Sequence, residues 1–276
     1  FAIGRGDLAL DVHQSLGNVV GYETSETAKT ALLHAWMQDR MSHPDQTQLG
    51  LTYRRADVRE MNRRATIALT EHGLRKNARR IKMGFVSCEF AAGDRVVLEK
   101  NDYRLGFRRG AIGTVVSVDP LLPALTIKFD GTGEKRLVDF REYRGAASLA
   151  FFTSIPRAQG MSVSRAYWLC ASPLTDSHLA CPAMTRHREK DGLKVFWSRD
   201  QIRDRDELRR LCSLDRTKQT TLDHEFGQQS AYPWRGEAVD VARKIVQERE
   251  AERKRERGAE AFSLDAKLGT NARHSR

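Results

Sequence analysis

The sequence predicts an α/β fold in which a parallel layer of strands and helices carries an inserted small antiparallel barrel. Residues 151–155 form a short apolar run that Pro156 ends, as in a strand buried on both faces. A strand candidate at 49–53 is followed at once by a helical pattern at 55–69. Between Gly93 and Tyr143, short β-rich runs alternate with Gly, Pro and Asp-Gly turn signals, and no helical period fits.

The helices are predicted by apolar side chains that recur on one face. Residues 1–11 offer little pattern, 17–22 is expected to be a connector, and a helix begins at Ser25 and ends before Pro44. Its apolar positions are Ala28, Ala31, Leu32, Ala35 and Trp36. The second helix, 55–69, turns Val58, Met61, Ala65, Ala68 and Leu69 inward, and Gly73 is its expected stop.

The expected barrel has strands at 95–98, 114–118, 125–129 and 137–140. Its first long loop carries Lys100, Arg104, Arg108 and Arg109, with Tyr103 and Phe107 among them. Cations and aromatic rings together suit phosphates and stacked bases. A solvated basic loop with two half-buried aromatic rings is the equally open alternative.

Residues 148–188 are expected to organise the chain. After the strand at 151–155, residues 157–160 turn the chain, a second strand covers 166–169, and 183–184 lead Arg186 and Arg188 out of the sheet. Guanidinium groups at the end of such a segment suit phosphate oxygens. Further on, 199–215 and the charged run 239–258 are predicted helical, and the chain from Ala259 on is predicted disordered.

Composition favours an anionic partner, nucleic acid first, because 47 Lys and Arg against 36 Asp and Glu give a formal charge of +11. No apolar run approaches the roughly 18 residues of a membrane span, so no membrane partner is expected. The four cysteines are dispersed, which predicts a reduced, cytoplasmic setting. The first residue is Phe1 and no leader follows, which suggests a piece of a longer protein.

Two kinds of site are disfavoured by the sequence. Cys170, His178, Cys181 and His187 lack the tight spacing of a zinc site, so no metal is expected and the cysteines are interpreted as small core residues. No G-x-x-x-x-G-K-[ST] loop is present, so the chain has no phosphate-binding loop of its own.

Four segments follow one another in an order that resembles a known family. Residues 51–62 (LTYRRADVREMN) resemble the opening of a second RecA-like lobe, and 93–115 resemble a small SH3-like barrel inserted in it. Residues 153–165 resemble helicase motif V, and 183–188 (AMTRHR) resemble motif VI. The set is similar to the C-terminal half of RecD-like superfamily-1 DNA helicases, and most closely to the helicase part of TraA-type conjugative relaxases of bacterial plasmids.

The resemblance implies five regions: the first part of the second RecA-like lobe at 1–86, the SH3-like β-barrel at 87–145, the rest of the lobe at 146–200, a charged helical tail at 201–258 and a disordered end at 259–276. The resemblance therefore implies the UvrD-like C-terminal region of a P-loop NTPase fold that lacks the P-loop half. The first RecA-like lobe and a relaxase domain are then expected upstream, as partners of this region.

By the same resemblance, Arg186 is the catalytic arginine that reaches the γ-phosphate of ATP held by the other lobe. Gln159, Gly160 and Arg188 are expected at the nucleotide cleft. Contacts with single-stranded DNA are expected from Thr153, Ser154 and Arg157, together with Lys100, Arg104, Arg108 and Arg109 of the basic loop. ATP and Mg²⁺ are expected as cofactors only when the missing lobe is joined.

Two prolines depart from the family pattern. Pro156 replaces the histidine of motif V, and Pro182 falls where a strand hydrogen bond is expected before motif VI. The expected function is therefore that of the C-terminal half of an ATP-dependent helicase from a conjugative relaxase, inactive alone. The alternatives are an ATP-independent module that binds DNA or a partner, and the product of a decayed gene.

Overall fold

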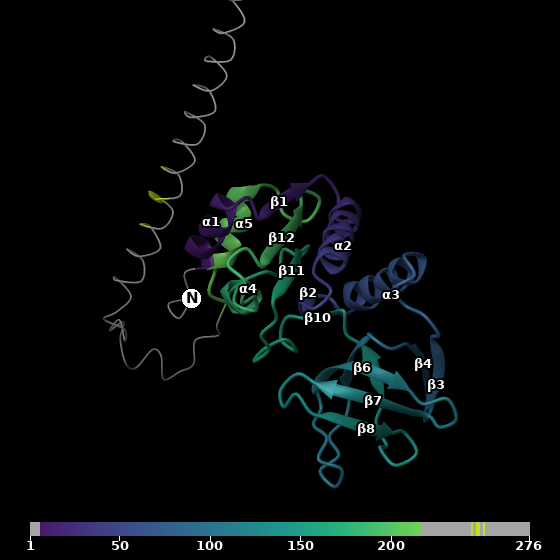
Figure 1. Ribbon diagram of the computed structural model, residues 1–276. Helices are drawn as coiled ribbons and strands as arrows, with labels where there is room; N and C mark the ends of the chain where they lie inside the picture. Colours follow the sequence, from purple (N-terminus) through teal and green to yellow (C-terminus); the bar gives the residue numbers. More distant parts are fainter. Residues whose placement is uncertain (1–5, 217–243, 245–246, 249–250, 252–276) are drawn as a thin grey trace, which may run out of the picture.

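The computed structural model describes residues 6–216 and, beyond them, only residues 244, 247, 248 and 251 (Figure 1). The predicted charged helix at 239–258 therefore lies almost entirely outside the described residues, and the predicted disordered end lies wholly outside them. Within the described part, no helix is both long and apolar enough to cross a membrane.

A five-stranded parallel sheet, covered by helices on both faces, forms the centre of the α/β part of the fold. Its order is β1 (Val19–Tyr22), β12 (Leu193–Ser198), β11 (Arg165–Cys170), β2 (Gln48–Thr52) and β10 (Phe152–Ser154). All four neighbouring pairs are parallel. Every residue of β2 is buried, because helices cover both faces of the sheet. The predicted α/β class with a parallel sheet is confirmed.

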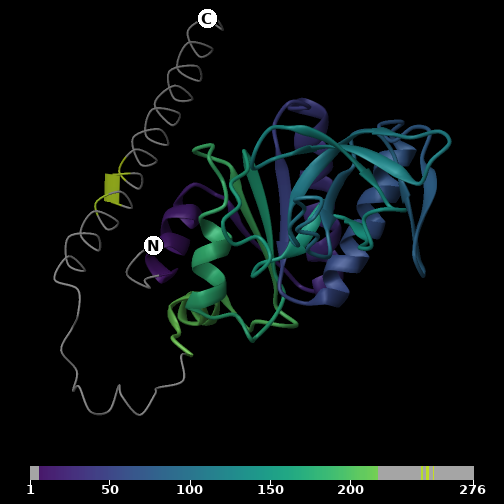
Figure 2. The same cartoon turned by 90° about the horizontal axis from the view of Figure 1, so that it is seen from below.

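Helices α2 (Ser25–Ser42) and α3 (Arg55–Glu71) cover one face of the sheet. Helices α1 (Gly6–Ser15), α4 (Ser177–Met184) and α5 (Arg205–Ser213) cover the other. Figure 2 shows the purple and green helices on one side of the strands and the blue helices on the other. The predicted helices at 25 and 55 are confirmed, and the apolar stripes predicted for them point to the sheet.

The region between α3 and β10 forms a second, antiparallel sheet. Its order is β8 (Lys135–Asp139), β7 (Ala124–Phe129), β6 (Ile112–Val118), β5 (Arg95–Leu98) and β9 (Ala147–Leu149). The four runs predicted here are strands, but the pairings among the described residues do not close them into the expected barrel. Strands β8 and β9 stand at opposite edges of the sheet, and no pairing joins them among the described residues.

A β-hairpin packs on the apolar face of the antiparallel sheet, which does not close into a barrel. It consists of β3 (Arg79–Met83) and β4 (Val86–Phe90), which the sequence analysis did not predict. Its inward side chains Ile81, Met83 and Phe90 share one apolar cluster with Leu125 and Val138. The hairpin therefore buries the apolar face of the sheet, which the interior of a closed barrel would otherwise bury.

Several local predictions are corrected by the structure. The expected connector at 17–22 contains strand β1, and helix α1 lies where little pattern was expected. Only 205–213 of the predicted helix 199–215 is helical, and its Leu208, Leu211 and Cys212 are buried in the core. Residues 183–184 do not leave a strand, because they end helix α4.

Pro182 lies inside α4, six residues after the N-cap Asp176, and not at a strand position. A proline there cannot donate to the carbonyl four residues earlier and crowds it. Pro156 is different, since it takes the second position of a turn in which the Ala158 amide donates to the Ile155 carbonyl at 3.1 Å. Proline suits that position because its φ is already near −65°.

Replacing Pro182 with alanine is therefore expected to raise the free energy of unfolding by about 2 kcal/mol, because the restored helix bond outweighs the added freedom of the unfolded chain. The melting temperature should rise by about 4–8 °C in a thermal unfolding measurement. The matched variant Pro156→Ala should lower stability slightly. A lower melting temperature for Pro182→Ala would show that the proline does not destabilise α4.

Candidate functional site

A turn at residues 155–162 follows the edge strand β10 and forms the centre of the candidate site. The Arg157 amide donates to the Ser154 carbonyl at 3.0 Å, and the Met161 amide donates to the Ala158 carbonyl at 3.0 Å. Gln159 and Gly160 are exposed at its tip. Gly160 has a φ of +83°, a left-handed conformation that favours glycine.

Arg186 binds this turn from the end of α4. Its Nη1 donates to the carbonyls of Ala158 at 3.2 Å and Met161 at 3.0 Å. Its Nε donates to the Pro182 carbonyl at 2.8 Å, and its Nη2 donates to Thr185 Oγ1 at 2.9 Å. A cation at the last carbonyls of a helix is favourable. Arg186 thus joins α4 to both sides of the turn tip.

The structure therefore brings Arg186 together with Gln159 and Gly160, which the sequence analysis assigned to one cleft. Arg186 is half-buried, and its burial lowers the pKa of its guanidinium from the usual value, although an arginine stays charged. A guanidinium has five N–H groups. The contacts described above use all but one of them, on Nη2.

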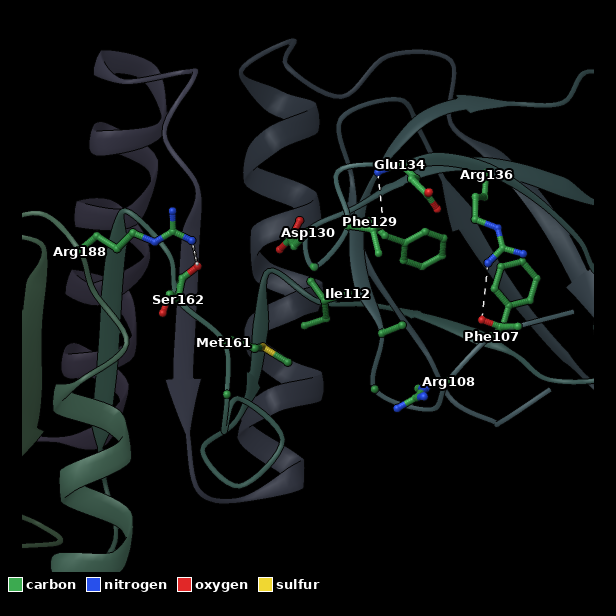
Figure 3. A pocket seen from close by; sticks show the side chains of 16 residues that line it. Phe107, Arg108, Ile112, Phe129, Asp130, Glu134, Arg136, Met161, Ser162 and Arg188 are labelled. Carbon is green, nitrogen blue, oxygen red and sulfur yellow. Dashed lines mark hydrogen bonds between the residues drawn. The ribbon is translucent and has the colours of Figure 1, made fainter. Parts of the chain in front are cut away.

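Arg188 lies on the solvent side of the same segment. Its Nη2 donates to the Ser162 carbonyl at 3.1 Å, and the backbone of 186–188 pairs with Val163. The guanidinium is exposed and lines a cavity of about 630 Å³ between the two sheets. Figure 3 shows Arg188 and Ser162 at one end of this cavity and Phe107 and Arg136 at the other.

Arg157, expected to contact DNA, is engaged by the antiparallel sheet. Its Nη1 and Nη2 donate to the two carboxylate oxygens of Glu99 at 3.0 and 2.8 Å. Burial alone would raise the pKa of Glu99, but the hydrogen bonds from Arg157 lower it overall. This two-point ion pair ties the 155–162 turn to the end of β5, so Arg157 is not a free cation.

Thr153 and Ser154 of β10 were also predicted to contact single-stranded DNA, and the structure shows how far each is exposed. Thr153 is only 2% exposed, so its expected position facing a single strand is wrong. It lies within the parallel sheet, where it pairs with the buried Leu51 of β2. Ser154 is half-buried at the end of the strand, and its role in binding DNA stays a prediction.

The basic loop at 100–109 is exposed and ordered by its own hydrogen bonds. The backbones of Asp102 and Phe107 bond each other in both directions at 2.8 Å, which makes the loop a small hairpin. Its four predicted DNA contacts are exposed, and none of them has an ion pair within the described part of the chain: Lys100, Arg104, Arg108 and Arg109. Of the four, Arg108 lines a cavity together with Gly160 and Met161, so this end of the loop lies near the 155–162 turn.

The two aromatic side chains of this loop have different environments. Tyr103 is 82% exposed and available for stacking. Phe107 is 5% exposed, because its ring packs on Tyr143 and Phe129 with centroid distances of 5.6 and 6.0 Å. Of the two aromatic rings predicted to stack on bases, only Tyr103 is exposed enough to do so.

A buried histidine pair next to Arg186 was missed by the sequence analysis. The rings of His13 and His187 meet edge to face with centroids 5.2 Å apart, and the Nδ1 atom of His13 is buried with no hydrogen-bond partner among the residues that the structure describes. Burial, with a smaller contribution from His187, lowers the pKa of His13 to about 4. Burial also lowers the pKa of His187. No pattern pairs residues so distant in the sequence.

Among the described residues, Cys170, His178, Cys181 and His187 do not form a group that could hold a metal ion. Cys170 and Cys212 are buried in the core, and burial raises the pKa of the Cys170 thiol to about 12. His178 bonds Asp215 at 3.1 Å. In the part of the chain that the structure describes, no three side chains of the His, Cys, Asp and Glu types are arranged to hold a metal ion.

Comparison with curated proteins identifies relatives over most of this chain. It is 32% identical over 232 residues to "Conjugal transfer protein TraA" of Rhizobium radiobacter and 30% identical over 228 residues to the protein of that name from Agrobacterium fabrum. A "Probable conjugal transfer protein TraA" of Sinorhizobium fredii is 31% identical over 225 residues. The matches cover 81–82% of this chain but 20% of each relative, so the chain spans about a fifth of their length. No protein-family model matches.

Comparison with solved structures gives weaker similarities. The crystal structure of Pif1 helicase from Bacteroides in complex with ADP-AlF3 and ssDNA is 19% identical, with a TM-score of 0.43 over 68% of this chain and 47% of that chain. Pif1 helicase from Candida albicans is 15% identical, with a TM-score of 0.40 over 61% of this chain and 52% of that chain.

Proposed function

Because the homologues of this chain are conjugal transfer proteins named TraA, we propose that it holds single-stranded DNA within a conjugative DNA-processing protein of the bacterial cytoplasm. The observation that carries the proposal is the exposed positive charge of the 100–109 loop, which has no ion pair among the described residues and whose Arg108 lines a cavity with Gly160 and Met161. Such a surface binds phosphates without reading sequence.

The proposal includes a motor role for the larger protein. In that role this chain is the second RecA-like lobe, its antiparallel sheet is the SH3-like insert, and ATP with Mg²⁺ is held by a lobe that this chain does not supply. Arg186 would then present its remaining Nη2 N–H to the γ-phosphate. A relaxase domain and the first lobe are the proposed partners.

A second candidate is a module that binds DNA without ATP. One observation favours it: the Arg186 guanidinium already donates to three backbone carbonyls and a hydroxyl. In this chain by itself that arginine acts as a connector within the fold. Both candidate functions use the same DNA-binding surface. They differ only in whether ATP changes the affinity of that surface for DNA.

Replacing Lys100, Arg104, Arg108 and Arg109 with alanine is expected to flatten the salt dependence of binding to a single-stranded oligonucleotide. Each phosphate contact contributes about 0.7 to the slope of log affinity against log salt, so losing four contacts lowers the slope by about 3. The slope is measured by fluorescence anisotropy at several salt concentrations.

A control variant with the same change in net charge is available. Arg199, Arg203, Arg205 and Arg210 are all exposed, but each lies within 4 Å of a carboxylate, at distances of 3.2, 2.7, 3.9 and 3.8 Å. Their replacement should leave the slope nearly unchanged. Equal flattening in both variants would mean that only net charge matters, and an unchanged slope in the first would remove the loop from the DNA-binding surface.

A further inference from the structure

The cavity of about 630 Å³ between the two sheets has a mostly apolar floor. Ile112 and Phe129 contribute from the antiparallel sheet, and Met161 contributes from the 155–162 turn. Ile112 also packs with Val97, Ala150 and Met161 in a small cluster that joins the two sheets. The floor is therefore held in place from both sides. Figure 3 shows Ile112 and Met161 near the middle of the cavity.

One wall of the cavity is a guanidinium plane held in a fixed orientation. The Arg136 guanidinium carbon lies 4.5 Å from the centroid of the Phe107 ring, and its Nη2 donates to the Leu105 carbonyl at 2.6 Å. Phe107 itself is buried. Figure 3 shows Arg136 against the face of this ring. One face of the plane is covered by Phe107, so a ligand that stacks on Arg136 must lie against the other face.

The rim of the cavity carries charges of both signs. Arg108 and Arg188 are exposed there without an ion pair to any described residue. The Glu134 carboxylate is exposed and likewise has no ion pair within the described part. Asp130 differs, because both of its oxygens accept hydrogen bonds from Arg95. Two cations and one carboxylate are thus free to meet a ligand.

We infer that this cavity takes one unpaired nucleotide of single-stranded DNA. The base stacks on the Arg136 plane over the apolar floor, its phosphate meets Arg108, and Glu134 accepts from an exocyclic amino group. Arg188, at the other end of the cavity, meets a phosphate of a neighbouring nucleotide. An apolar ligand would leave the rim cations unused, and a small anion would leave the floor unused, whereas a nucleotide uses both. The volume lies in the range of ligand sites. The inference rests on the proposed function and adds a base-dependent contact to it.

The test compares two oligomers of equal phosphate number, oligo(dC) and an abasic oligomer, bound by the whole chain. Stacking of one base predicts about tenfold tighter binding of oligo(dC). Arg136→Lys keeps the charge but loses the plane, so it should bind both oligomers equally well. Arg80→Lys, at an exposed arginine on the β3–β4 hairpin outside the cavity, should keep the preference.

Tyr103 is a second exposed surface for stacking, so its contribution is tested separately. In Tyr103→Ala the tenfold preference should persist. Loss of the preference in Tyr103→Ala, with its retention in Arg136→Lys, would overturn the inference.

Cross-linking of the unaltered protein with an iodocytosine oligomer gives a readout that does not depend on any variant folding. Cross-links are expected at Phe129 or Met161, and cross-links confined to other residues would overturn the inference. Equal binding of both oligomers by the unaltered protein would overturn the inference and leave the proposed function standing. Absence of binding to either oligomer would overturn both.

Discussion

Replacing Arg186 with alanine is expected to lower the free energy of unfolding by about 3 kcal/mol, because three backbone carbonyls lose a charged donor. In a chain of this size the melting temperature should fall by about 6–12 °C. Lysine cannot replace the planar fork, so Arg186→Lys should recover only a small part of the loss. Thermal unfolding followed by circular dichroism measures both variants.

Arg188→Ala is the matched control, since Arg188 lies two residues further on and its guanidinium makes one hydrogen bond to the described residues, with the Ser162 carbonyl. Its loss should cost under about 0.5 kcal/mol. An equal fall for both variants would contradict the role of Arg186 as the connector of α4 and the 155–162 turn.

The proposed catalytic role of Arg186 has a separate readout. In a protein that also contains the upstream lobe, Arg186→Ala should abolish ATP turnover and leave DNA affinity unchanged at a temperature where the variant is folded. Equal loss of turnover and of DNA affinity would contradict this role and leave only the structural one.

Acidification from pH 7 to pH 5 is expected to destabilise the fold by about 2 kcal/mol through His13 alone. Its pKa is lowered from 6.5 to about 4, so between these values the unfolded chain binds a proton that the folded chain does not. Stability from this group is complete above pH 6.5 and is lost as pH falls toward 4. The lowered pKa of His187 acts in the same direction.

The measurement is the melting temperature at several pH values between 7 and 5, a range above the usual pKa of carboxylates. His13→Leu should reduce the dependence on pH, because the apolar replacement has no proton to bind. Replacing the exposed His34 on α2 with glutamine is the control and should leave the dependence unchanged. If the melting temperature of His13→Leu depends on pH as strongly as that of the unaltered protein, the pair of His13 and His187 is not the source of the dependence.

Much of the fold was predictable because its signals are local. The stripe that contains Leu32 and Trp36 has the period of a helix, and both side chains lie in the core beneath α2. Strand β5 has the bounds predicted for it, since an apolar run between turn residues needs no distant partner to be recognised. Strand β1 was missed because four residues carry too little pattern, and parallel pairing with β12, far along the chain, makes it a strand.

The sequence predicted which residues of the candidate site lie near one another, but not the contacts that they make. The order of motifs placed Arg186 with Gln159 and Gly160, and the structure brings the three together at one turn. The same reasoning assigned Arg157 to DNA, yet Glu99 pairs with it from another sheet. Ion pairs between residues 58 positions apart have no period and no spacing rule, so only folding reveals them.

The sequence by itself determined the α/β class, the antiparallel insertion and the positive loop at 100–109, because periodicity, turn residues and charge are properties of neighbouring residues. Tertiary structure alone decided that the insertion stays an open sheet and that Pro182 lies in a helix. It also decided that Arg136, Met161 and Arg188 line one cavity. These features depend on which distant surfaces bury each other, and burial is a property of the whole chain.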